Sequence, residues 1–162
     1  MFATSSLDGY IMLYTFPSFN VIRSIYIPFL FKEQTEFLHA DNIFLSNYPL
    51  PCFAIYISKK KLFKIFTING HDIGEMKEDS DTESIKCGFV LTSFDFQDYL
   101  IYGTNDGFVK IRRFPELNLI HKINPFNNGK SIESLCISKD SRFIFCWSDS
   151  NEIGVISNNF TK

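Results

Sequence analysis

The sequence lacks the features that mark several classes of protein. It has no basic surplus, because 16 Lys and Arg stand against 18 Asp and Glu, for a formal net charge of −2 at pH 7. Proteins that hold nucleic acid by general electrostatics carry a clustered basic excess, so we expect no nucleic-acid partner. Hydrophobic residues make up 45% of the chain, which is too many for a disordered protein.

Long apolar runs and paired cysteines are also missing. The longest apolar run, residues 25–31, is interrupted by Pro28 and falls far short of the ~20 residues of a membrane-spanning helix. The N-terminus has no basic start or apolar centre of a secretory signal, so we expect a cytoplasmic location. No C-x-x-C pair occurs, and we expect small buried thiols rather than a zinc site or a disulfide framework at Cys52, Cys87, Cys136 and Cys146.

Helical periodicity is almost absent, whereas strand signals recur along the whole chain. No window repeats apolar residues at i, i+3, i+4 and i+7. Short apolar runs alternate with turns rich in Asp, Asn, Gly, Ser and Lys, which is typical of antiparallel β-meanders. The sequence therefore predicts an all-β fold, with strands at residues 10–16, 21–27, 42–46, 52–57, 62–68, 87–92, 99–102, 108–114, 132–137, 142–147 and 153–157.

The strands also repeat as groups. The strand after the second hairpin turn of each group begins at residues 10, 62, 108 and 153, which are 52, 46 and 45 residues apart. This interval is close to the ~40–45 residues of a four-stranded propeller blade. A second marker, Ser-x-Asp followed by an apolar strand, begins at Ser93 and again 45 residues later at Ser138. Two different turn types thus keep one period.

These markers predict a single partial β-propeller segment over residues 1–162. It comprises a partial blade at 1–28, a connection at 29–41, blades at 42–79 and 85–124, and a final blade at 131–162 that lacks its outer strand. A propeller closes only with about 4–8 blades. We therefore expect the segment to belong to a longer chain or to complete a ring by self-association, and to be oligomeric or poorly soluble when expressed alone.

The turns supply the candidate structural residues. Gly after Asp gives the positive φ that a tight hairpin requires, and a turn Asp hydrogen-bonds its own backbone. On this basis the acids Asp95, Asp98 and Asp106 are interpreted as turn residues rather than as paired catalytic acids. The candidate turn residues are Asp8, Gly9, Asp95, Asp106, Gly107 and Asp140.

No pattern of catalytic or metal-binding residues is present. His39, His71 and His121 are each 32 or more residues from the next and are expected on exposed loops or edges. The sequence contains no G-x-S-x-G elbow, phosphate-binding glycine loop or H-E-x-x-H helix. We expect a non-catalytic protein without cofactor or metal; a propeller enzyme with ionisable groups at its central channel is the alternative of a different class.

The repeat resembles that of the WD-repeat propeller family. Residues 103–107 (Gly-Thr-Asn-Asp-Gly) and 5–9 (Ser-Ser-Leu-Asp-Gly) fit the element that precedes the third strand of its repeat. The positions of the namesake Trp-Asp pair hold Tyr14-Thr15, Phe66-Thr67 and Arg112-Arg113. The resemblance therefore implies a degenerate member without the hydrogen-bond network built on that Asp.

A closer resemblance is to the C-terminal propeller of BEACH-domain proteins of the neurobeachin and lysosomal-trafficking-regulator type. It rests on residues 4–9, 13–17, 62–70, 85–95, 98–103, 108–112 and 131–140. The resemblance implies a protein-interaction scaffold in vesicle and membrane trafficking, peripheral to endomembranes. Other proteins, or the BEACH domain and lipid-facing domains expected upstream of this segment, would be its partners.

Two charged stretches allow further interpretations. The lysine turn Lys59–Lys61 is interpreted as a solvated hairpin tip, and together with Arg112 as a candidate contact for an anionic surface, which makes a phosphoinositide-binding or membrane-surface-binding propeller the alternative function. Strand alternation points Arg112 and Arg113 to opposite faces, so one headgroup would not meet both. The acidic stretch 75–84 is interpreted as a linker, with Ser80 and Thr82 as candidate phosphorylation sites.

Overall fold

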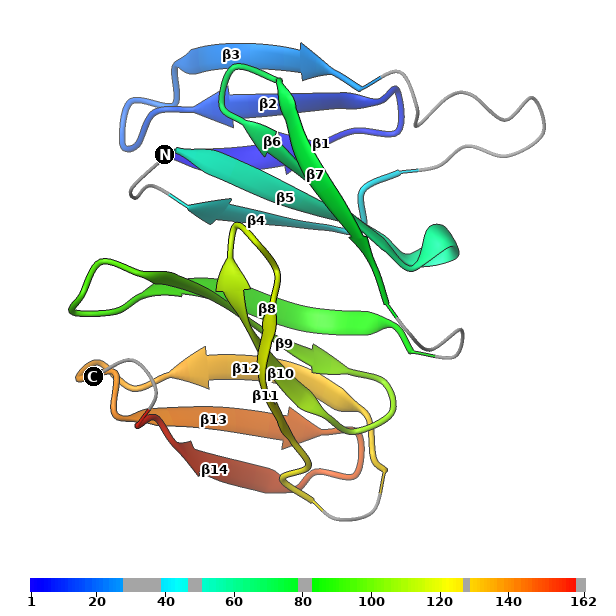
Figure 1. Cartoon of the computed structure of the whole chain (residues 1–162), viewed down its shortest axis with the longest axis vertical. Helices are drawn as coiled ribbons and strands as arrows, with labels where there is room; N and C mark the ends of the chain where they lie inside the picture. The colour runs from blue at the N-terminus through cyan, green and yellow to red at the C-terminus, as the bar shows by residue number, and fades with distance from the viewer. Residues whose placement is uncertain (28–38, 47–50, 79–82, 127–128, 160–162) are drawn as a thin grey trace. The chain divides into compact units, whose positions relative to one another are not determined.

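The computed structural model describes residues 1–27, 39–46, 51–78, 83–126 and 129–159. It divides into two compact units, Met1–Glu78 and Asp79–Lys162. Each unit contains one three-stranded and one four-stranded antiparallel sheet (Figure 1). The described residues hold strands and one short 3-10 turn, so the all-β prediction is confirmed.

The first unit holds two antiparallel sheets. Sheet I consists of β1 (Phe2–Ser5), β2 (Tyr10–Tyr14) and β3 (Val21–Tyr26), in that order. Sheet II consists of β4 (Asn42–Ser46), β5 (Cys52–Ile57), β6 (Leu62–Thr67) and β7 (Asp72–Lys77), also in chain order. A 3-10 turn, η2 (Ser58–Lys60), joins β5 to β6.

Sheets I and II are held together by one apolar core. Ile11 and Leu13 alternate along β2 and are both fully buried, and they join Phe53, Ile55 and Ile57 of β5. Period-two alternation places these side chains on one face of each strand. All six residues of β5 are buried, which matches its unbroken run of apolar and small residues.

The second unit repeats this plan in the opposite order. Sheet III consists of β8 (Ile85–Thr92), β9 (Asp98–Thr104), β10 (Val109–Phe114) and β11 (Leu119–Ile123). Sheet IV consists of β12 (Ile132–Ile137), β13 (Phe143–Ser148) and β14 (Ile153–Ser157). Both sheets are ordered as in the chain, each strand pairing with the next.

The core of the second unit lies between sheets III and IV. Ile101, Val109 and Ile111 of sheet III pack in it with Ile132 and Ile144 of sheet IV. The two sheets approach closely at Gly103, where an added Cβ would lie 2.7 Å from the Cβ of Ile132. A side chain at that position would push the sheets apart, so glycine is required there by space rather than by conformation.

Three strands and some thiols differ from what the sequence predicts. The edge strands β1, β7 and β11 lay outside the expected runs because their mixed polar and apolar residues are half-buried or exposed. The acidic linker expected from Glu75 begins later, since β7 continues to Lys77. Cys52 and Cys146 are buried as expected, but Cys87 is only partly buried and Cys136 is exposed. Cys136 was expected to be buried because it lies in an apolar run, but it is on the open face of sheet IV.

Candidate protein-interaction surface

One five-residue turn recurs between the strands. In the turn Ser6–Tyr10, the Ser6 amide donates to the Tyr10 carbonyl at 3.0 Å and the Gly9 amide donates to the Ser6 carbonyl at 3.1 Å. The Ser6 hydroxyl donates to the Asp8 carboxylate, and Gly9 has φ +82°. These features describe a type I turn closed by a residue in the left-handed region.

The turn Thr104–Phe108 has the same geometry in sheet III. The Thr104 amide donates to the Phe108 carbonyl at 3.0 Å, the Thr104 hydroxyl donates to Asp106, and Gly107 has φ +88°. A Cβ on Gly107 would lie 2.7 Å from the Lys130 carbonyl oxygen. Both conformation and space therefore require glycine at this position.

Two further turns begin with Ser-x-Asp, as Ser6–Tyr10 does, but have no glycine, and the second of them is one residue longer. In Ser93–Gln97 and Ser138–Phe143 the left-handed position is taken by Phe96 at φ +61° and by Ser141 at φ +57°. The serine hydroxyl donates to the carboxylate two residues on, Asp95 or Asp140. This hydrogen bond is the main cause that lowers the pKa of each carboxyl below its ordinary value, and Asp8 is lowered in the same way by Ser6.

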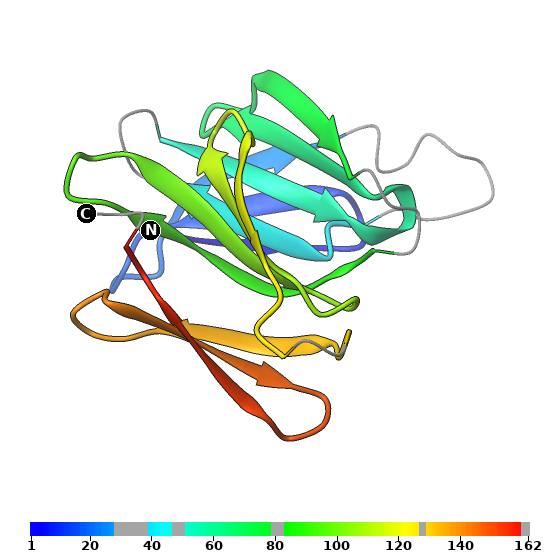
Figure 2. The same cartoon turned by 60° about the horizontal axis from the view of Figure 1, so that its bottom comes forward.

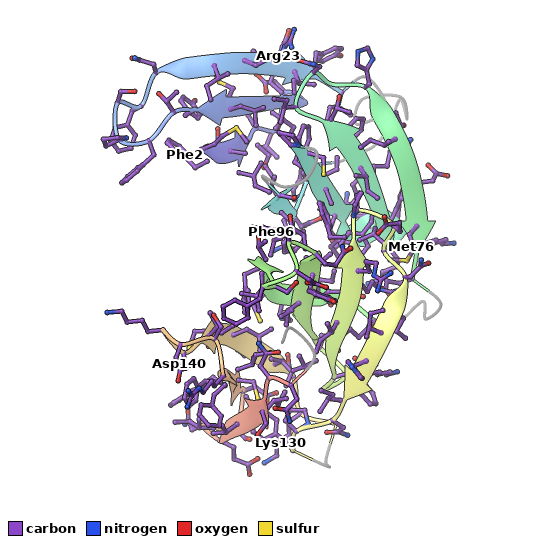
Figure 3. The ribbon with its side chains drawn as sticks, turned by 60° about the vertical axis from the view of Figure 1, so that its left-hand side comes forward. Phe2, Arg23, Met76, Phe96, Lys130 and Asp140 are labelled. Atoms are coloured by element: carbon purple, nitrogen blue, oxygen red, sulfur yellow. The ribbon has the colours of Figure 1, made fainter. Side chains whose placement is uncertain are left out.

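These two turns lie side by side in the second unit and form what we call the aromatic turn surface, Ser93–Gln97 with Ser138–Phe143. Phe94 is 82% exposed and Phe96 is 60% exposed. Thr92, Ser93, Phe94 and Ser141 line a hollow of about 120 Å³ between the turns. Figure 3 shows Phe96 and Asp140 at the same side of this unit. Sequence reasoning identified Asp95 and Asp140 but missed the two phenylalanines, whose only signal is the alternation of aromatic and polar residues in Ser93–Gln97.

The first unit presents aromatic side chains of its own. Phe16 and Phe19, in the loop between β2 and β3, are both exposed. Phe19 meets Phe2 edge-on, with ring centroids 5.7 Å apart, and Phe2 stacks on Tyr14 at 4.8 Å. This cluster covers one end of sheet I.

Arg112 requires a correction. We expected it as a candidate contact for an anionic surface, but its side chain is buried. Its Nε donates to the Tyr102 hydroxyl at 2.7 Å and a terminal nitrogen donates to the Leu117 carbonyl at 2.8 Å. Arg112 stands opposite Leu100 in the ladder, so Tyr102 is its diagonal neighbour on the same face. The guanidinium is used inside the sheet and is not available to a headgroup.

The other candidate residues are not brought together into a site. Lys59 is exposed, Lys60 and Lys61 are partly buried, and Lys61 has φ +52° at the end of η2. Ser80 and Thr82 lie outside the described residues. His39 contacts the Asp41 carboxylate at 3.3 Å, whereas His71 and His121 are exposed. Within the described residues, no three His, Cys, Asp or Glu side chains gather as a metal site would require.

The described part of the chain also contains no helix that is long and apolar enough to cross a membrane. No protein-family model matches the sequence, and no curated protein matches it either. Solved structures do match.

One match is a chain of the structure of ctPRC2 in complex with H3K27me3 and H3K27M, with a TM-score of 0.56 and 21% sequence identity. The match covers 72% of this chain and 26% of that chain, so the present chain spans about a quarter of the length of the chain that it matches. At this identity the likeness concerns the fold alone. Together with the four antiparallel sheets of three or four strands that the described residues form, it identifies the fold as a partial WD-repeat-like β-propeller.

Proposed function

We propose that this protein is a non-catalytic interaction scaffold and the C-terminal propeller segment of a BEACH-type protein of vesicle and membrane trafficking. The observation that carries the scaffold role is the aromatic turn surface, where Phe94 and Phe96 are exposed on turns fixed by internal hydrogen bonds. Exposed aromatic side chains are the commonest anchors of protein interfaces. A turn that is already ordered loses little conformational entropy when a partner binds.

The trafficking role is supported by the sequence resemblance given above. The cellular location that we propose with it is the cytoplasm, at the periphery of endomembranes. The genomic reading frame upstream of Met1 tests the family directly: a BEACH-like domain in frame supports the proposal, and an in-frame stop codon without such a domain opposes it.

The scaffold role is tested by proximity labelling in cells with matched variants. Phe94→Ser combined with Phe96→Ser removes the anchors of the aromatic turn surface, and Phe16→Ser combined with Phe19→Ser removes exposed aromatics from the first unit. We expect the wild type and the Phe16→Ser, Phe19→Ser variant to label trafficking proteins. We expect the Phe94→Ser, Phe96→Ser variant to lose this labelling. Equal labelling by all three proteins would contradict the role of this surface.

A membrane-lipid role is the second candidate, carried by the lysine turn at Lys59–Lys61. Because Arg112 is buried, these lysines are the basic residues that remain of the predicted contact for an anionic surface. Flotation with vesicles that contain phosphoinositides tests it. Binding that is lost when Lys59, Lys60 and Lys61 are all changed to Gln would favour the lipid role over the protein scaffold.

We also propose that residues 1–162 self-associate when expressed alone. Two of the four sheets that the described residues form have three strands rather than the four of a full propeller blade. A sheet edge that lacks its fourth strand can pair with another copy of the chain.

A further inference from the structure

We infer that β14 is a homotypic docking edge, through which two copies of the chain pair antiparallel, β14 against β14, about a two-fold axis at Val155. This inference deepens the proposed self-association and rests on it, but it does not depend on the trafficking role. It would join two three-stranded sheets into one sheet of six strands.

Within the described residues, sheet IV has three strands. Sheets II and III each add a fourth strand, β7 or β11, after their third strand. In the described residues no strand pairs with the outer side of β14, which Figure 2 shows at the margin of sheet IV. At the end of β14 the pairing with the residues before β13 continues: the Asn158 amide donates to the Arg142 carbonyl at 2.7 Å and the Asn158 side chain donates to the Ser141 carbonyl at 2.6 Å.

The hydrogen-bonding groups on the open edge can be assigned from the ladder. The Ser148 amide donates to the Glu152 carbonyl at 3.0 Å, and the amide of Asn158 bonds to Arg142 at the other end of the strand. Because antiparallel pairs alternate, Gly154 and Ile156 direct their N–H and C=O groups to β13. The corresponding groups of Ile153, Val155 and Ser157 point away from β13, toward the open edge.

β14 lacks the charges that protect the other last strands. β3 carries Arg23, β7 carries two acids and a lysine, and β11 carries Lys122. β14 has the sequence Ile-Gly-Val-Ile-Ser and no charge, and Ile153 and Val155 are 62% and 58% exposed. Charged side chains on an edge strand prevent pairing with another chain, so an uncharged, apolar edge favours it.

A second copy fits this edge because β14 is complementary to itself. With the axis at Val155, the Val155 residues of the two copies form a hydrogen-bonded pair, and Ile153 of each copy pairs with Ser157 of the other. Three such pairs would form about six hydrogen bonds. No like charges meet, and the two-fold symmetry is that of most soluble dimers.

Apolar side chains on the open face of sheet IV lie next to the strand that would pair. Phe145 stands opposite Val155, and Trp147 stands opposite Ile153. Phe145, Trp147 and Ile153 border a hollow of about 250 Å³ together with Cys136. Pairing at Val155 would extend this face as one apolar strip across both copies, and cross-strand pairs of aromatic and β-branched residues stabilise such a strip.

The first test is oligomeric state, measured by size-exclusion chromatography with light scattering over a wide range of concentration. Val155→Pro removes one N–H on the open edge and leaves the bonds of Gly154 and Ile156 to β13, whereas Val155→Thr keeps every N–H. We expect the wild type and Val155→Thr to dimerise and Val155→Pro to remain monomeric, with circular dichroism to show that the variants fold.

The second test needs no proline variant. In a Cys136→Ser background, Val155→Cys places two thiols in one hydrogen-bonded pair, with Cα atoms about 5.5 Å apart, within reach of a disulfide. Ile153→Cys is the matched control, because its two copies would lie about 13 Å apart along the strands. We expect mild oxidation to cross-link the first protein several-fold more than the second.

Each other outcome overturns the inference. Oligomers that persist in Val155→Pro would show that the copies associate elsewhere than through the edge of β14. If Trp147→Glu dissociates them while Val155→Pro stays dimeric, the copies associate through the open face of sheet IV. In both cases the proposed self-association would remain valid. Equal cross-linking at both positions would show another register or another partner strand. A wild type that is monomeric at all concentrations would overturn the proposed self-association together with this inference.

Discussion

Two loops of this protein have similar backbone conformations but different surroundings. Residues 16–20 (Phe-Pro-Ser-Phe-Asn) lie between β2 and β3, and residues 114–118 (Phe-Pro-Glu-Leu-Asn) run from the last residue of β10 to β11. Both contain a cis Phe–Pro bond, and φ is +57° at Phe19 and +58° at Leu117. The closing hydrogen bonds match as well, since Thr15 donates to Asn20 and Arg113 donates to Asn118, each at 2.9 Å.

The side chains of the two loops differ completely in burial. Phe16 is 72% exposed, whereas Phe114 is 0% exposed. In sheet III the ladder continues to the pair Phe114–Asp98, and the Gln97 side chain donates to the Phe114 carbonyl at 2.9 Å. In sheet I the ladder between β1 and β2 runs to the pair Phe2–Tyr14. The comparison shows that local sequence sets the backbone and neighbouring strands set the burial.

The largest expected contrast is between the two loop phenylalanines. Phe114→Ala should lower the free energy of unfolding by about 3–5 kcal/mol, because it empties a fully buried position. Phe16→Ala should change it by less than about 0.5 kcal/mol, as at other exposed positions. Urea titration of both variants measures the difference in the free energy of unfolding. Equal decreases in the two variants would contradict the different burial of the two phenylalanines.

The left-handed positions offer a second contrast. Leu117→Gly should cost about 2–4 kcal/mol, because the loss of a buried leucine outweighs the relief of its positive φ. Phe19→Gly should change stability by less than about 1 kcal/mol, because the same relief is offset by the lost contact with Phe2. A large loss in Phe19→Gly, seen in thermal melts, would show that the loop of sheet I is buried in solution.

The turn Thr104–Phe108 before β10 gives a third prediction. Gly107→Val should lower stability by about 1–3 kcal/mol, because a β-branched residue is strained at φ +88° and its Cβ meets the Lys130 carbonyl. Gly107→Asn should lose less, because asparagine tolerates the left-handed region better. An unchanged melting temperature in Gly107→Val would contradict the assigned turn.

The smallest expected effect is an acid dependence common to both units. Asp8, Asp95 and Asp140 have pKa values lowered by their serine hydroxyls, so each favours the folded state above the unfolded pKa of about 3.9 and loses that contribution as the pH falls through the folded pKa. Ser93→Ala should make the decrease in stability on acidification shallower. A urea midpoint series from neutral to acid pH measures it, with the exposed Ser24→Ala as control; an unchanged slope in Ser93→Ala would contradict the role of the hydroxyl.

The fold and the candidate surface were predictable to different depths. The Asp-Gly pairs at Asp8 and Asp106 identify their turns because glycine alone enters the left-handed region without strain. The same conformation at Phe96 and Ser141 gives no such signal, since neither residue type favours it. The exposure of Phe94 and Phe96 was missed because apolar residues are ordinarily expected inside.

The burial of Arg112 was not predictable from alternation alone. Alternation separates Arg112 from Arg113 but does not say which face of β10 is covered. That depends on the register that brings Tyr102 next to Arg112 and on the loop that turns the Leu117 carbonyl toward it. Charged residues are buried only where such partners meet them.

The sequence by itself determined the all-β fold, the spacing of the strand groups and the Asp-Gly turns, because these depend on residues close together in the chain. The tertiary structure decided which of two equivalent loops is buried, how a guanidinium is held inside a sheet and which strand keeps an open, uncharged edge. Those properties depend on contacts between distant strands, and the free energy of burial is set by the neighbours that a side chain meets rather than by the side chain alone.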